Sequence, residues 1–130
     1  MNKEWSEKEI QDFYIALLHE ALGSIPDSGA VMVLGPMFII RAVDENFEIM
    51  RKKQFELRLL GKYVFDQIPF TDHVLEDAPF AYDKKFELFY KKLIASGKIT
   101  AVYLLPDWRQ SLGTVSEVAF CKEFGVPIFE

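Results

Sequence analysis

The stretch "ITAVYLLPDWRQSLGTVSEVAFCKEFG" (residues 99–125) decides the fold. It opens with an apolar run, 99–105, which is typical of a strand covered on both faces. A polar loop follows, and then an apolar segment at about 114–124 that predicts a helix ending at Gly125. A buried strand that leads through a loop into a helix is the repeating unit of a parallel sheet. We therefore expect an α/β protein.

The same alternation continues on both sides of this stretch. Apolar runs bounded by glycine or proline predict the other strands, and apolar residues at helical spacing predict the other helices. The order α-β-α-β-α-β-α-β predicts a mostly parallel sheet with helices on both faces. Pro127 cannot donate a ladder hydrogen bond, so we expect the last strand at an edge. Besides those above, the predicted strands cover 30–35, 62–67 and 126–129, and the predicted helices cover 6–22, 42–60 and 81–96.

Two of the predicted helices carry recognisable detail. Ser6 and Glu9 have the spacing of a capping box, which fixes the start of the first helix. In the helix at 81–96, apolar residues fall on one face, and the lysines of "DKK" (83–85) and "KK" (91–92) are predicted to point outward. The inward residues are expected to be Phe86, Phe89, Tyr90 and Leu93.

Composition limits the classes of protein that this chain can belong to. Its 130 residues, half of them hydrophobic, suit one domain with a real core. The apolar runs are too short to span a bilayer and the charged N-terminus lacks a signal peptide, so no membrane partner is expected. The single cysteine, Cys121, is expected to be a small buried side chain, and together these features indicate the cytoplasm. A net charge of −5 argues against a nucleic acid polymer as partner.

Three segments should meet where a ligand binds, because ligands of parallel sheets lie beyond the carboxyl ends of the strands. They are Gly35-Pro36-Met37, the long loop 66–80, and residues 106–114. Gly35 either lets a ligand approach the backbone or simply allows a turn. No glycine-rich phosphate motif is present, so no cofactor is expected.

Two loops hold further candidate residues. Trp108 can stack on a base or anchor its loop, and Arg109 can meet a phosphate or remain a solvated charge. The loop 66–80 is acidic and contains His73, but its spacing matches no metal-ligand pattern. We expect a solvated lid there, and no metal site.

Glu117 has two competing interpretations. Thr114 and Glu117 have capping-box spacing, which would make Glu117 a purely structural residue. Alternatively, its carboxylate faces a pocket as a nucleophile or general base. A carboxylate suits attack on a sugar carbon with oxocarbenium character, because it stabilises the positive charge and can form a covalent ester.

The C-terminal pattern Leu-Pro-x-Trp-x-x-Ser-x-Gly-x-x-x-Glu, together with "GPM" at 35–37, resembles the nucleoside 2-deoxyribosyltransferase-like superfamily. It is most similar to a small uncharacterised branch of that superfamily. The resemblance covers about residues 30–130, which implies a domain of this kind at 26–130 and a helical extension at 1–25. The matching residues are Leu105, Pro106, Trp108, Ser111, Gly113 and Glu117.

The resemblance implies a flavodoxin-like three-layer sandwich with an extra N-terminal helix. It also implies an N-glycosidase or 2-deoxyribosyltransferase that cleaves the N-glycosidic bond of a nucleoside or nucleotide, with Glu117 as the nucleophile. Homo-oligomers are usual in the family. The substrate-binding residues are expected to be Gly35, Pro36, Met37, Asp107, Trp108, Ser111, Gly113 and Thr114.

Two positions differ from the enzymes of the family. Thr100 and Ser111 stand where those enzymes carry aspartates. This difference favours an alternative function, a nucleotide-binding or sensing module without turnover on the same fold. A third possibility is a scaffold subunit that assembles through its N-terminal helix.

Overall fold

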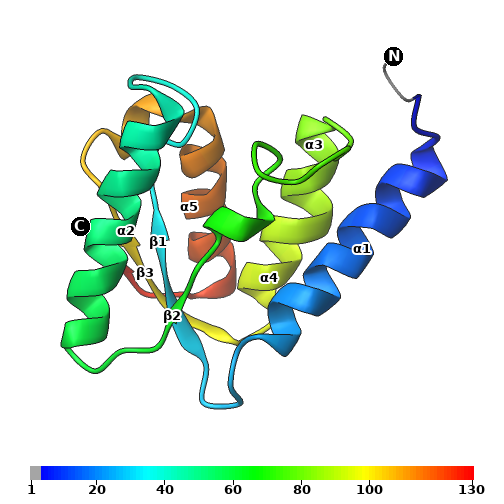
Figure 1. Cartoon of the computed structure of the whole chain (residues 1–130). Helices are drawn as coiled ribbons and strands as arrows, with labels where there is room; N and C mark the ends of the chain where they lie inside the picture. The colour runs from blue at the N-terminus through cyan, green and yellow to red at the C-terminus, as the bar shows by residue number, and fades with distance from the viewer. Residues whose placement is uncertain (1–3) are drawn as a thin grey trace.

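The protein is an α/β domain with a four-stranded sheet, seen in a computed structural model that describes residues 4–130 (Figure 1). All strand pairs are parallel and the strand order is β2-β1-β3-β4. The chain thus steps from β1 to one side and then crosses back to the other, which is the flavodoxin-like order. The predicted fold class is confirmed. The strands are β1 (Ala30–Leu34), β2 (Val64–Phe65), β3 (Ile99–Leu104) and β4 (Ile128–Phe129).

The helices form a layer on each face of the sheet (Figure 1). One layer is α2 (Val43–Leu59), and the other contains α1 (Glu7–Gly23) and α5 (Leu112–Phe124). The second layer also contains a continuous helical segment made of α3 (Tyr82–Lys85), the π-helix η2 (Phe86–Tyr90) and α4 (Lys91–Ala95). Within residues 4–130, no helix has both the length and the apolar character needed to cross a bilayer. Two short 3-10 helices complete the list, η1 (Ile68–Phe70) and η3 (Trp108–Gln110).

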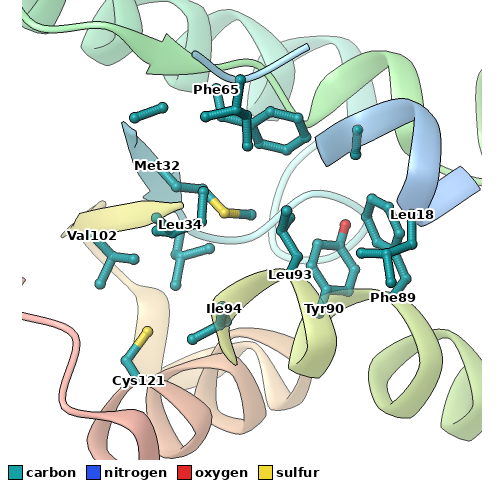
Figure 2. Packing of buried hydrophobic residues seen from close by; sticks show 14 of the residues in the cluster. Leu18, Met32, Leu34, Phe65, Phe89, Tyr90, Leu93, Ile94, Val102 and Cys121 are labelled. Atoms are coloured by element: carbon teal, nitrogen blue, oxygen red, sulfur yellow. The ribbon is translucent and has the colours of Figure 1, made fainter. Parts of the chain in front are cut away.

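Alternate residues of β1 supply two separate cores, because successive strand side chains point to opposite faces. Val31 and Val33 pack under α2. Met32 and Leu34 belong to the larger core on the other face, which also contains Leu93 and Phe89 of the α3–α4 segment (Figure 2). The larger core also buries Tyr14, Leu17, Leu18 and Ala21 of α1. The N-terminal helix is therefore packed into the main core, and its predicted capping box is present.

Strand ends differ from the prediction in two places. The run at 62–67 forms only Val64–Phe65, because Asp66 leaves the ladder and accepts hydrogen bonds from the Ile68 N–H and the Gln54 side chain. The run at 126–129 forms only Ile128–Phe129. As expected, β4 lies at the edge of the sheet beyond Pro127, and the Pro127 carbonyl accepts from the Val102 N–H.

The outward position predicted for the lysines of "DKK" is wrong for Lys85. Its side chain is 7% exposed, and its ammonium group lies 3.5 Å from a carboxylate oxygen of Asp72. A lysine is tolerated in such a place only when an acid pairs with it. Because Asp72 comes from a loop 13 residues earlier in the sequence, helical spacing alone could not show this pairing.

The segment 66–80 is a solvated lid only in part. Gln67, Ile68 and Thr71 are buried, and Phe70 packs against Phe65 and Phe89 of the core. The stretch from His73 to Asp77 is mostly exposed, as is Phe80. The first half of this segment is therefore a fixed part of the fold.

Candidate functional site

A cavity of about 290 Å³ lies beyond the carboxyl ends of β1 and β3. This is the point where the strand order reverses direction, which is where parallel sheets of this kind bind ligands. Its volume is near the lower end of the usual range for ligand pockets. The lining residues are Gly35, Met37, Phe38, Ile39, Tyr82, Gln110, Ser111, Leu112, Gly113, Thr114 and Glu117.

The start of α5 overturns the capping interpretation of Glu117. Ser111 is the N-cap, and its hydroxyl accepts a hydrogen bond from the Thr114 N–H at 3.3 Å. Glu117 therefore lies beyond the first turn and cannot complete a capping box with Thr114. Ser111 and Thr114 are both good cap residues, and Gly113 is a poor helix former, so the predicted start at 114 came two residues too late.

Gly113 allows α5 to pack closely against the α3–η2 segment. A Cβ atom at this position would lie 2.8 Å from the Phe86 ring and 3.2 Å from the Tyr82 hydroxyl oxygen. The absence of a side chain thus brings Tyr82 into the wall of the cavity. Gly35 serves packing as well, because a Cβ there would lie 2.6 Å from the side chain of Leu105.

Glu117 is 6% exposed and lines the cavity. Its Oε2 atom and the hydroxyl of Thr114, one turn earlier on α5, are buried without a hydrogen-bond partner among the described residues. Burial of such groups is costly unless something pairs with them. A ligand in this cavity could pair with both, so the two atoms indicate a polar contact point at its inner end.

Burial also changes the acidity of this region. It raises the pKa of Glu117 from 4.5 to about 8, an effect that the positive charge of Lys85 opposes. Burial, and then the charge of Glu117, raise the pKa of Tyr82 and raise that of Cys121 to about 12, so both stay protonated at neutral pH. Glu117 can therefore donate a hydrogen bond when protonated, and can act as a nucleophile or base when ionised.

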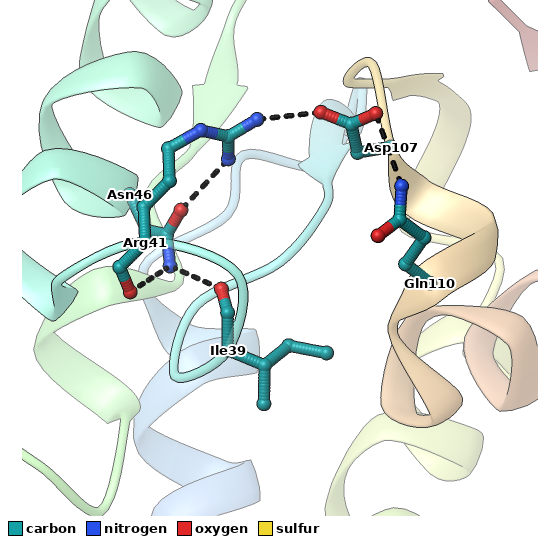
Figure 3. Close-up of polar contacts among 5 residues, drawn as sticks. All are labelled: Ile39, Arg41, Asn46, Asp107 and Gln110. Carbon is teal, nitrogen blue, oxygen red and sulfur yellow. Dashed lines mark hydrogen bonds and ion pairs between the residues drawn. The ribbon is translucent and has the colours of Figure 1, made fainter.

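A polar network joins the loops on either side of the cavity (Figure 3). Arg41 donates to Asn46 at 3.0 Å and to Asp107 at 2.6 Å, and Asp107 also accepts from Gln110. The Asn46 amide donates to the carbonyls of Ile39 and Arg41, and thereby holds Ile40 between them at a φ of 76°. A β-branched residue rarely adopts this conformation, so the network holds the loop after β1 in a strained shape.

Some residues predicted to bind the substrate lie outside the Glu117 cavity, in this network or in a second cavity. Pro106, Asp107 and Trp108 line a separate cavity with Lys53, Arg109 and Glu130. The Trp108 indole donates to Glu130 at 2.8 Å, and the Arg109 guanidinium lies 4.5 Å from the centre of its ring. The expectation that Trp108 shares a pocket with Glu117 is therefore wrong, and the ring anchors its loop. Asp107 is likewise occupied by Arg41.

The other predicted residues divide as follows. Met37, Ser111, Gly113 and Thr114 line the cavity beside Gly35, whereas Pro36 is buried and is not part of the lining. Thr100 lies at the opposite, amino end of β3, where its hydroxyl donates to the Ala30 carbonyl. Its difference from the family pattern therefore does not change the wall of this cavity.

Five lining residues are not among the predicted substrate-binding residues, although two of them lie within the predicted segment 106–114. Gln110 and Leu112 flank the predicted Ser111, and Phe38 and Ile39 follow Met37 directly. The run "MFII" (37–40) was a signal, because such an apolar stretch directly after a strand end can form the rim of a pocket. No feature of the sequence could have predicted Tyr82 in the lining, because its position depends on the contact with Gly113.

Two other kinds of site have less support among the described residues. No group of histidine, cysteine, aspartate and glutamate side chains within residues 4–130 is arranged to hold a metal ion. A hollow of about 380 Å³ beside α1 is larger than the Glu117 cavity, but Glu7, Lys8, Gln11 and Lys84 line it. These are long polar side chains at the surface, and Glu7 and Lys84 pair with each other.

Compared with known proteins, the chain matches no protein-family model, no curated protein and no solved structure. The resemblance to the nucleoside 2-deoxyribosyltransferase-like superfamily therefore remains an interpretation of the motif residues. Any functional proposal must be supported by the geometry around Glu117.

The raised pKa of Glu117 predicts how stability depends on pH. The ordinary pKa of a glutamate is 4.5, and that of Glu117 in the folded state is about 8. Between these two pH values the folded state retains a proton that the unfolded state loses. The free energy of unfolding should therefore fall as pH rises through this window, by about 1 kcal/mol per pH unit. Glu117→Gln removes the titrating group and should gain stability relative to wild type from pH 5 to pH 8, as measured by urea unfolding.

Glu123→Gln is the matched control, because Glu123 is exposed on the same helix. It should follow the wild-type dependence on pH. Unfolding energies of Glu117→Gln that run parallel to those of wild type from pH 5 to pH 8 would show that Glu117 is not the group that titrates.

Proposed function

We propose that this protein cleaves the N-glycosidic bond of a nucleoside, as an N-glycosidase or 2-deoxyribosyltransferase, with Glu117 as the nucleophile. The observation that carries the proposal is a buried carboxyl group that lines a cavity at the crossover between β1 and β3. Its Oε2 has no hydrogen-bond partner among the residues that the structure describes. The motif resemblance supports the same assignment of Glu117. The mostly apolar wall, with Met37, Phe38 and Tyr82, suits a flat base.

The reaction follows in two steps. An oxygen of the ionised Glu117 attacks C1′ of the sugar, and the C1′–N bond breaks with its electron pair going to the base, which takes up a proton from solvent. The product is a glycosyl ester of Glu117. Water, or the nitrogen of a second base, then attacks C1′, loses its proton to solvent and releases the Glu117 carboxylate.

The charges around the cavity favour an unphosphorylated nucleoside as substrate. The described lining residues include no lysine or arginine, and the carboxylic acid among them is Glu117. Arg41 and Arg109 of the neighbouring loops are paired with Asp107 and Glu130. A 5′-phosphate would therefore enter a largely apolar pocket without a basic partner, and it would repel Glu117 in the ionised form that the reaction needs.

A binding module without turnover is the second candidate, and one observation favours it. With a pKa of about 8, Glu117 is mostly protonated at neutral pH. In that form it can donate a hydrogen bond to a bound base or sugar, next to the Thr114 hydroxyl, without forming a covalent bond. A nucleotide sensor would need no more than this.

Location and assembly complete the proposal. A buried lone Cys121 suits a reducing compartment, and we assign the protein to the cytoplasm. The rim of the cavity exposes apolar side chains at Phe38, Ile39 and Leu112, and Phe80 lies nearby with its ring 6.4 Å from that of Tyr82. Exposed apolar patches of this kind mark interaction surfaces. A homo-oligomer formed through this rim would cover them.

Base release tests the two functions against each other. Purified protein should release free base from a panel of nucleosides, and the corresponding 5′-monophosphates should react more slowly. Glu117→Gln should abolish release, because an amide cannot form the ester, while nucleoside binding is retained. Glu123→Gln, on the exposed face of the same helix, should react like wild type. Release that survives Glu117→Gln within a few fold would eliminate the nucleophile role.

Light scattering tests the oligomer. Wild type should have the mass of a dimer or a higher oligomer at working concentration. Phe80→Asp places a charge on a side chain that is 82% exposed, so it should shift the mass to that of a monomer without unfolding the protein. A monomeric mass for wild type would contradict the proposed assembly.

A further inference from the structure

Lys85 belongs to a buried polar cluster outside the Glu117 cavity. Its ammonium group lies 3.5 Å from Asp72, and the exposed fractions of the two side chains are 7% and 16%. The Tyr14 hydroxyl of α1 donates to Asp72 at 3.3 Å and to the Pro79 carbonyl at 2.7 Å. An ion pair of this kind is often no more stabilising than apolar residues of similar size. Stability alone therefore gives little reason for a lysine at this position.

The helix directs Lys85 towards the candidate site. Lys85 follows Tyr82 by three residues, which places both on one face of the helix, and Tyr82 lines the Glu117 cavity. The Lys85 ammonium group also lies 5.6 Å from the centre of the buried Tyr90 ring. A π-helical turn starts at the next residue, Phe86, and such turns are frequent at functional sites.

Lys85 is the positively charged group near Glu117. Gly113 of α5 packs against Tyr82 and Phe86, and Glu117 follows Gly113 by four residues, so the α5 face that carries Glu117 lies against the turn that holds Lys85. The charge of Glu117 raises the pKa of Tyr82, Tyr90 and Cys121, and all three are neutral when protonated. Among the described residues whose charge acts on Glu117, Lys85 is the cation. Asp72 pairs with Lys85 at 3.5 Å and holds it in place.

We propose that Lys85 is a positioning residue for Glu117: its buried ammonium group, anchored by Asp72, stabilises the carboxylate form of Glu117 in the cavity. Lys85 does not line the cavity and need not touch the ligand. Asp72 belongs to the segment 66–80, so that segment helps to set the charge of the site without reaching into it. The catalytic meaning of this arrangement rests on the proposed function, whereas the coupling between the two charges does not.

The acidities of both groups agree with this arrangement. Burial lowers the pKa of Lys85, and the charges of Asp72 and then Glu117 raise it again. Burial raises the pKa of Glu117 to about 8, and Lys85 lowers it. A carboxyl group that is equally buried but has no such cation would stay protonated to a still higher pH. Lys85 thus keeps Glu117 within reach of ionisation near neutral pH.

The test is an NMR titration of the ¹³C-labelled glutamate carboxyl groups, with the Glu117 signal assigned by its loss in Glu117→Gln. Lys85→Met should raise the Glu117 midpoint by about one pH unit or more, whereas Lys85→Arg should leave it near the wild-type value. Lys84→Met, at the preceding and more exposed position, should not change it. Base release by Lys85→Met at pH 7 should fall about tenfold or more and recover as pH rises.

A Glu117 midpoint that is the same in folded Lys85→Met and in wild type would overturn the proposal. If Lys85→Met does not fold because Asp72 is left unpaired, the double variant Lys85→Met/Asp72→Asn removes both charges, and the same midpoint shift is expected. A purely structural role for Lys85 would lower stability without moving the midpoint. If the midpoint shifts but wild type releases no base, the Lys85 proposal holds and the proposed function fails.

Discussion

The burial of the Glu117 carboxyl group is the constraint on which the rest of the site depends. The fold places this group in the second turn of α5, where its Oε2 has no hydrogen-bond partner in the described part of the chain. Such a group destabilises the protein unless it is protonated or a ligand pairs with it. Proteins retain a destabilising group of this kind where their function requires it. The Thr114 hydroxyl also lacks a partner among residues 4–130 and lies one turn away, so one ligand in the cavity could pair with both atoms.

The surrounding fold positions this carboxyl group through long-range packing. The parallel order β2-β1-β3-β4 brings the loops after β1 and β3 together, and Arg41 links them through Asp107 (Figure 3). Gly113 lets α5 approach the α3–η2 segment closely enough for Tyr82 to reach the cavity. On the same helix face as Tyr82, Lys85 carries a positive charge anchored by the segment 66–80. Each contact joins segments that are distant in the sequence.

The distance in sequence between contacting residues explains which features of the structure the sequence could predict and which it could not. Apolar periodicity and turn residues predicted each strand, the sheet type and two of the three segments expected around the cavity, because these depend on local patterns. The third segment, 66–80, was wrongly placed there, because none of its residues lines the cavity. The start of α5 was misplaced, since Ser111 and Thr114 are equally good caps. Lys85 was assigned to the surface and Trp108 to the pocket, because their partners, Asp72 and Glu130, lie 13 and 22 residues away in the sequence. Helical and strand periodicity carry no information about such pairs.

The central claim, that Glu117 forms a covalent bond with the sugar, can be tested directly by mass spectrometry. A 2-deoxy-2-fluoro nucleoside is a suitable probe, because fluorine destabilises the oxocarbenium-like state and slows hydrolysis of the glycosyl ester. We expect the protein to gain the mass of one fluorinated sugar, mapped to Glu117 in the tryptic peptide 110–122, and Glu117→Gln to gain none. Release of base without an adduct on Glu117, or an adduct on another residue, would contradict it.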